Sequence, residues 1–360
     1  MNDTSSGGVL MLTLIKVLRW STVAWLGIFP VLSIAHHSFT ATFDVATVNE
    51  LEGEVMSLQW GNPHVLITLR ATDELGQQTI HEIESHSLSI MRRMDISSGA
   101  LNVGDTIRVA GHPARQVENA MFVLNALLPS GQEIVFDPWG EPRWAENIGT
   151  TEVWQATEDD AEPQDEGIFR VWSTAMNHPN AWPFPEMFDL SLIDNYPLTD
   201  ESRVVVEAFD PLTDLPTLNC VSKGMPTIME QPYPMEIVEE GDSILLRIEE
   251  YDTLRTVHMS ETVTLANQPF SKLGYSTGRW EGGTLVVTTT NVNWPHFDSV
   301  GIPLSDAVEI VERFTPSVDG SRLDMTMTVT DPATFTESVE IGKTWLAIPG
   351  IQVEPYDCIN

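Results

Sequence analysis

Alternation of apolar and polar residues is the main pattern along this chain, and it is clearest between Gly274 and Asn291. Two β-rich runs flank Glu281-Gly282-Gly283, a turn in which glycine can take the positive φ of a tight hairpin. The pattern therefore predicts a β-hairpin whose second strand covers residues 284–290.

A first domain is predicted over residues 36–136. Alternating runs at 49–58, 64–71 and 78–84 predict three strands in a meander, and the apolar spacing over 87–94 predicts a short helix. Two further strands are predicted at 105–110 and 120–128. The order strand-strand-strand-helix-strand-strand is typical of a small OB-like β-barrel.

A second domain, almost all strand, is predicted over residues 201–360. Its fold class is mainly β, an antiparallel meander that closes into a lipocalin-like barrel with room for one small ligand. Asp319-Gly320 is a strong turn signal within it, and prolines interrupt the first of its runs. The predicted strands cover 227–238, 243–251, 253–260, 275–280, 284–290, 307–315, 322–330 and 335–345.

Between the two domains, residues 137–200 contain five of the eleven tryptophans and an acidic run from Glu158 to Glu166. We expect a linker whose tryptophans dock onto the flanking domains. An aromatic platform for sugar rings is the functional alternative.

The N-terminus is typical of an export signal. Lys16 and Arg19 precede an apolar run over 20–34, and Ser33-Ile34-Ala35 supplies small residues where a signal peptidase cuts. Residues 1–35 are therefore predicted to be a signal peptide, and the mature chain to start at His36 in the periplasm or outside the cell, without stable membrane insertion. An uncleaved anchor is the alternative, and Met11 is an alternative start.

The amino-acid composition limits the kinds of molecule that this protein is expected to bind. The chain has 18 Lys and Arg against 52 Asp and Glu, a formal charge of −34. Such a surface repels nucleic acid and anionic membranes and favours cations or basic partners. The simplest interpretation is a solvated acidic surface suited to a salty environment.

Cys220 and Cys358 are the only cysteines. In an oxidising compartment such a pair closes, so one disulfide is predicted. A redox pair or metal thiolates are the alternative, against which the absence of a C-x-x-C spacing argues.

Two sets of motifs carry family resemblances. Ala35-His36-His37-Ser38-Phe39, Gly53-Glu54-Val55, Trp60-Gly61-Asn62-Pro63-His64 and Gly104-Asp105 resemble an uncharacterised family of small exported bacterial proteins. The second domain is similar to another uncharacterised β-rich bacterial group, although Gly283 stands where that group usually has an acidic residue. Neither resemblance implies an activity. The second set comprises Cys220, Gly224-Met225-Pro226, Arg255, His258, Gly278-Arg279-Trp280-Glu281-Gly282, Glu312-Arg313, Asp331-Pro332 and Cys358.

A metal site is one candidate for the chemistry. As a mature N-terminal residue, His36 would offer both its α-amine and its imidazole, which suits Cu(II), with His37 or His64 as a further ligand. Copper is thus the cofactor to consider. The alternative is an ordinary His-His terminus and a turn histidine.

Polar residues of the second domain form the other candidate site. His258, or His296 with Asp298 two positions away, could serve as a general base, and Arg255 lies three positions before His258 on a predicted strand. The ligand-binding candidates are Arg279, Trp280, Glu281 and Glu250. The structural alternative is that Arg279 and Glu281 pair across the hairpin while Trp280 fills the core.

These features lead to two hypotheses. The first is an exported binding or accessory protein that holds a small apolar or amphipathic ligand in the C-terminal barrel. The second is an enzyme, either a cofactor-free isomerase or lyase using barrel histidines, or a copper enzyme using His36. We favour the binding protein, since no G-x-S-x-G, H-E-x-x-H or Gly-rich phosphate loop is present.

Overall fold

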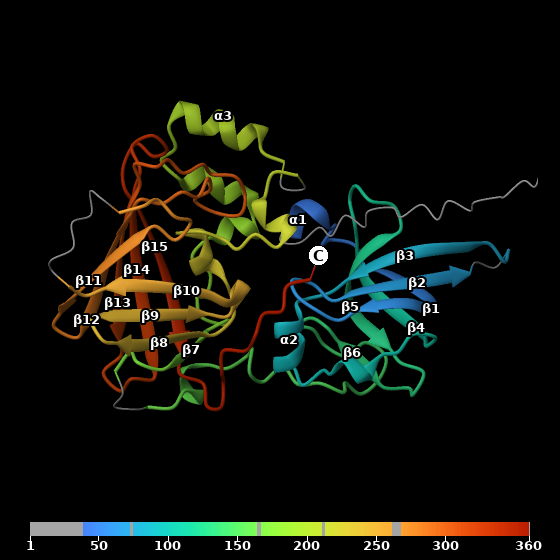
Figure 1. Cartoon of the computed structure of the whole chain (residues 1–360). Helices are drawn as coiled ribbons and strands as arrows, with labels where there is room; N and C mark the ends of the chain where they lie inside the picture. The colour runs from blue at the N-terminus through green and yellow to red at the C-terminus, as the bar shows by residue number, and fades with distance from the viewer. Residues whose placement is uncertain (1–38, 73–74, 164–166, 211–212, 261–267, 360) are drawn as a thin grey trace, which may run out of the picture. The chain divides into compact units, whose positions relative to one another are not determined.

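A computed structural model describes residues 39–72, 75–163, 167–210, 213–260 and 268–359 (Figure 1). His36 and His37 lie outside these described residues.

The first part of the chain folds as the alternating pattern predicted. The strands β1, β2 and β3 form an antiparallel meander, and β4 pairs with β1 on its other side and with β5. The parallel pairing of β3 with β5 then closes five strands into an OB-like barrel (Figure 1). The side chain of Ser87 accepts a hydrogen bond from the Ile90 N–H and so caps the helix between β3 and β4. The elements are α1 (Phe39–Thr42), β1 (Asn49–Gln59), β2 (Leu66–Thr72), β3 (Gln78–Glu84), α2 (Leu88–Arg93), η1 (Ser98–Ala100), β4 (Thr106–Pro113), β5 (Ala120–Leu127) and β6 (Glu133–Val135).

The second part forms a closed barrel of nine strands in the order β10-β11-β12-β13-β14-β15-β7-β8-β9. The hairpin predicted around Glu281 is confirmed, and Gly282 takes a φ of 63° in its turn. The strands are β7 (Val171–Thr174), β8 (Met235–Glu240), β9 (Ser243–Ile248), β10 (Thr253–His258), β11 (Tyr275–Glu281), β12 (Thr284–Thr290), β13 (Glu309–Pro316), β14 (Arg322–Thr330) and β15 (Val339–Leu346).

Short helices lie between these strands. They are η2 (Glu158–Asp160), η3 (Pro185–Met187), η4 (Leu190–Asn195), α3 (Asp200–Ala208), η5 (Pro216–Asn219), η6 (Thr227–Glu230) and η7 (Glu250–Asp252). Among the residues that the structure describes, none of the helices is both long and apolar enough to cross a membrane.

The barrel differs from the sequence prediction in three details. The strand predicted over 227–238 is η6 followed by β8, because Pro232 and Pro234 interrupt the strand pattern. The segment predicted to be a linker supplies β7, which pairs with both β8 and β15. The neighbours β10 and β11 are parallel, so the barrel is not a pure antiparallel meander.

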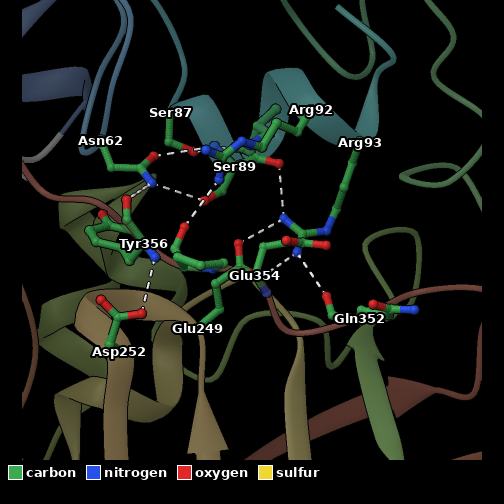
Figure 2. A network of polar contacts seen from close by, with 12 residues as sticks. Asn62, Ser87, Ser89, Arg92, Arg93, Glu249, Asp252, Gln352, Glu354 and Tyr356 are labelled. Carbon is green, nitrogen blue, oxygen red and sulfur yellow. Dashed lines mark hydrogen bonds and ion pairs between the residues drawn. The ribbon is translucent and has the colours of Figure 1, made fainter.

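Residues 352–358, near the C-terminus, connect the two barrels (Figure 2). Arg93 of α2 donates to the Glu249 carboxylate and to the Gln352 carbonyl, and Glu249 also accepts the Glu354 N–H. The predicted disulfide between Cys220 and Cys358 is confirmed. The C-terminal segment is therefore held from both sides by buried, charged and covalent contacts.

Asn62, from the Trp60-Gly61-Asn62-Pro63-His64 motif, makes the second connection (Figure 2). Its side chain is fully buried, its amide donates to the Ser89 hydroxyl and the Tyr356 carbonyl, and its backbone bridges to Cys358. Motifs from opposite ends of the chain thus meet in one polar network.

Candidate functional site

The interior of the nine-stranded barrel is apolar and rich in methionine. Alternate residues of β14 point inward, including Met325 and Met327, and both are at most 2% exposed. Methionine is unbranched and polarisable, so it adapts to guests of different shape. The buried methionines of this core are Met225, Met229, Met235, Met325 and Met327.

Lys343 projects from β15 into this apolar core between Ile341 and Trp345, and it is 1% exposed. Its ammonium donates to the carbonyls of Met229, at 2.9 Å, and Gln231, at 2.5 Å. The Trp345 ring centroid lies 5.1 Å from Nζ. Burial lowers the pKa of Lys343 to about 7, because nearby carboxylates offset only part of the desolvation.

The nearby carboxylates are Glu230 and Glu250, and both belong to a buried ion cluster. The Lys223 ammonium lies 2.8 Å from Glu230 Oε1 and 3.0 Å from Glu250 Oε1. Burial disfavours the Lys223 charge, but the two carboxylates outweigh it and raise its pKa. Burial also raises the pKa of Glu250, which Lys223 only partly opposes. Glu250, a ligand-binding candidate, is therefore a buried residue of η7 whose charge acts on Lys343.

Arg255 is fully engaged inside the barrel. Its guanidinium pairs with both carboxylate oxygens of Glu312 on β13, at 2.9 Å for Nη1 to Oε1, and donates to the hydroxyls of Ser276 and Thr289. Removing a buried partner of such a pair is costly, which gives Arg255 a structural role in joining β10 to β13.

His258 lies on the opposite face of β10 from Arg255, because residues three positions apart on a regular strand point to opposite sides. Its ring stacks on Tyr275, with centroids 4.6 Å apart and planes 13° apart. The structure therefore does not bring these two catalytic candidates together.

His296 and Asp298 follow β12 in the loop at one end of the barrel, but they face different neighbours. The His296 ring packs against Phe209 and Trp294, and burial lowers its pKa while Asp214 opposes the shift. Asp298 Oδ1 instead accepts three backbone N–H groups, from residues 300–302. No hydrogen bond joins His296 to Asp298 within the described residues.

The partner of Asp298 is Glu186, which the sequence did not indicate. Both carboxyl groups are buried, and Asp298 Oδ2 and Glu186 Oε1 have no hydrogen-bond donor in the part of the chain that the structure describes. Burial first, and then the neighbouring carboxyl, raise the pKa of Asp298, and burial raises that of Glu186. A single proton held between the two carboxyls would satisfy both oxygens. Tyr196 donates to the other oxygen of Glu186 at 3.0 Å.

Arg279, Trp280 and Glu281 lie on the surface at the hairpin. Glu281 pairs with Arg279 at 2.7 Å and with Arg313 at 2.8 Å, and these arginines lower its pKa. Trp280 was expected to fill the core as the structural alternative, but it is 43% exposed and packs edge-on against Phe169.

His64 lies at the start of β2 beside the end of β3. Its Nδ1 is 2.9 Å from the Ser85 carbonyl and 3.3 Å from the Glu84 carboxylate. Burial lowers the pKa of the neighbouring His86 to about 4. Among the described residues no group of three or more His, Cys, Asp or Glu side chains is arranged to hold a metal ion, and the His36 and His37 ligands lie outside them.

A groove of about 280 Å³ lies where β7 meets β15. Its walls include Ala175 and Leu346, which directly follow the paired residues Thr174 and Trp345. The rest of its lining comes from Ala156, Thr157, Glu158, Asp159, Asn177, His178 and Pro179.

The described chain is thus a two-barrel β protein, with an OB-like barrel followed by a nine-stranded barrel that carries buried ionisable groups. Residues 26–121 match the model of a family described as a family of unknown function (DUF6152). This match confirms the resemblance of the N-terminal domain to an uncharacterised family, and the resemblance of the second domain stays a prediction. No curated protein matches the chain.

Proposed function

We propose that this protein is an exported binding or accessory protein whose C-terminal barrel holds a small apolar or amphipathic ligand. The observation that carries the proposal is an apolar, methionine-rich barrel interior into which Lys343 projects, with the buried Lys223 ion cluster close enough to act on its charge. Ligand sites are typically apolar with a few convergent polar groups, and groups with shifted pKa values mark them. The net charge of −34 disfavours nucleic acid as the partner.

Export is part of the proposal. The N-terminal signal pattern and the disulfide between Cys220 and Cys358 both favour an oxidising compartment, the periplasm or the cell exterior. N-terminal sequencing of protein secreted from its own signal tests this, and the expected first residue is His36. Retention of residues 1–35 in the exported protein would contradict it.

A fluorescent apolar probe tests ligand binding. We expect N-phenyl-1-naphthylamine to bind saturably at one site and to receive excitation energy from Trp172 and Trp345, which are buried in the barrel. Met327→Trp, which fills the interior, should weaken binding by about tenfold or more. Met56→Trp is the matched control, because Met56 is 37% exposed on β1. Absence of saturable binding, or equal affinity in both variants, would overturn the proposal.

We propose separately that the N-terminal domain binds copper, with His36, His37 and His64 as ligands. Phe39 packs at 4.8 Å against Phe122, whose ring in turn packs against His86. Copper analysis of protein exported from its own signal tests the site, with His64→Gln expected to reduce stoichiometry and His178→Gln as the control. Lack of copper binding by the wild-type chain starting at His36 would contradict it.

An enzyme is the second candidate function, because the buried Glu186 and Asp298 carboxyls can exchange one proton beside Tyr196. In this alternative Asp298 acts with Glu186, and not with His296. The alternative requires turnover of a bound ligand that Asp298→Asn abolishes while binding of N-phenyl-1-naphthylamine is retained. Ligand retention without turnover supports the binding protein.

A further inference from the structure

We propose that Lys343 is a covalent capture site for a small aldehyde or ketone, which reaches the barrel at the β7–β15 seam and forms an imine with Nζ. This inference rests on the proposed ligand-binding function of the barrel and specifies the chemical class of its ligand.

The first observation is a set of buried polar atoms without partners around Lys343. They belong to Gln231, whose carbonyl accepts from Nζ, to its neighbour Glu230, to Trp345, and to Thr174 opposite Trp345 in the ladder. A buried polar group without a partner destabilises the fold, so four of them near one amine indicate a polar guest. Within the described residues, the atoms are Glu230 Oε2, Gln231 Oε1, Thr174 Oγ1 and Trp345 Nε1.

The second observation is a route of entry. The short strand β7 is held by two residue pairs to β15 and two to β8, whereas β14 and β15 share eight. Strand pairs of this length contribute little to holding the barrel closed. The 280 Å³ groove lies directly outside this seam, and its wall residues Ala175 and Leu346 are one position from the inward-facing Thr174 and Trp345. A molecule in the groove is therefore separated from Lys343 by a seam of the barrel wall that only two residue pairs hold together.

The third observation is the state of the amine. Because burial holds the pKa of Lys343 near 7, about half of the molecules carry a neutral, nucleophilic amine at neutral pH. The second buried lysine, Lys223, is the opposite case, since two carboxylates keep it charged. The structure thus distinguishes one reactive lysine from one that serves in an ion cluster.

The chemistry balances without an oxidant or reductant. The lone pair of Nζ attacks the carbonyl carbon, and one N–H proton moves to the carbonyl oxygen to give a carbinolamine. The hydroxyl group then leaves as water together with the remaining Nζ proton, which gives the neutral imine.

Reductive trapping tests the inference on the whole exported chain. The protein is incubated with propanal or benzaldehyde and sodium cyanoborohydride at pH 7, and the alkylated residue is located by peptide mass spectrometry. Residues 36–360 contain three lysines, Lys223, Lys272 and Lys343, so the assignment is direct. We expect Lys343 to be alkylated at least about tenfold faster than the exposed Lys272. Lys343→Arg should lose this adduct and Lys272→Arg should keep it.

Different results would contradict imine formation at Lys343 and ligand binding in the barrel. Binding of N-phenyl-1-naphthylamine is measured on the same samples, with circular dichroism as the check that each variant is folded. Alkylation confined to Lys272 or the terminal amine, with dye binding intact, overturns imine formation and leaves the binding protein standing. Loss of dye binding in wild-type protein overturns the proposed function itself. If Lys343→Arg does not fold, the wild-type ratio of adducts at Lys343 and Lys272 still decides the question.

Discussion

Arg93 on α2 and Glu249 after β9 form a buried, two-pronged ion pair (Figure 2). The side chains are 8% and 0% exposed, so neither charge has bulk water as an alternative partner. Both also hold backbone groups of residues 352–354. The pair therefore fixes the C-terminal segment as well as linking two elements far apart in sequence.

Removing one member of this pair should be strongly destabilising. We expect Arg93→Met to lower the free energy of unfolding by about 3–5 kcal/mol, because Glu249 is left charged and buried. Chemical denaturation measures the effect. Arg70→Met is the matched control, since the Arg70–Glu54 pair on β1 and β2 is partly exposed and should cost less than about 1 kcal/mol. Equal costs at the two sites would contradict the role assigned to Glu249.

Breaking the disulfide should lower the free energy of unfolding by a comparable amount, because the bond restricts the conformations of the unfolded chain. Cys220 and Cys358 are separated by 138 positions, and closing a loop of that length stabilises by about 5 kcal/mol in the chain-entropy model. We expect the double variant Cys220→Ser, Cys358→Ser to lose several kcal/mol of unfolding free energy in urea. A reducing agent should shift the wild-type protein by the same amount and leave the double variant unchanged. Unaltered stability on reduction would show that the bond does not constrain the unfolded chain.

The lowered pKa of Lys343 predicts stability that rises with alkalinity. The folded protein releases the Lys343 proton near pH 7, whereas the unfolded chain holds it until about pH 10.4. Between these values the unfolded state binds more protons, so stability rises with pH, by roughly 5 kcal/mol over the window.

Comparison of wild type with Lys343→Met by urea denaturation between pH 7 and 10 measures this contribution. Lys343→Met should not become more stable between pH 7 and 10 as the wild type does. Lys272→Met should keep this rise in stability because Lys272 is exposed. A wild-type profile parallel to that of Lys343→Met would show that Lys343 is charged in the folded state throughout.

The carboxyl pair Glu186–Asp298 predicts a loss of stability as pH rises. Its raised pKa values keep a proton in the folded state that the unfolded chain releases near pH 4. Stability should therefore fall above about pH 4, by about 1.4 kcal/mol per pH unit for each retained proton, until the folded pair ionises.

Asp298→Asn should remove this loss, because the amide oxygen still accepts the N–H groups of residues 300–302 while the amide nitrogen donates permanently to Glu186. We expect the variant to match wild type near pH 5 and to exceed it near pH 8 in thermal or urea unfolding. Asp319→Asn is a control of opposite sign, since hydrogen bonds from Ser317 and Ser321 lower the Asp319 pKa to about 2 and stability is lost as pH falls toward it. A variant less stable than wild type at pH 8 would exclude the shared proton.

The sequence predicted both barrels because side-chain alternation in a strand is a local property. Strands at 49–58, 78–84, 284–290 and 322–330 are found within a residue of their predicted ends. β7 was missed because four residues are too few to establish a period, and its strand character depends on pairing with β8 and β15. The parallel pairing of β10 with β11 depends likewise on tertiary structure.

The candidate site was harder to predict because it depends on which side chains converge. Asp298 was identified, but its partner Glu186 lies in another element and no spacing connects them. Lys343 did leave a signal, since it occupies the apolar face of a predicted strand, between Ile341 and Trp345. A lysine on the apolar face of a strand is buried when that face packs against the core. This rule would have identified Lys343 as a candidate site residue.

The position of residues 352–358 in the chain has a consequence for biogenesis. These residues follow every strand of both barrels, so a chain emerging from its N-terminus can complete the two barrels before the segment that joins them is available. Assembly of the network around Arg93 and Asn62 is then a late maturation step, and oxidation of Cys358 marks its completion. Cells that lack a thiol oxidase should accumulate protein with both barrels formed and the C-terminal segment open to proteases.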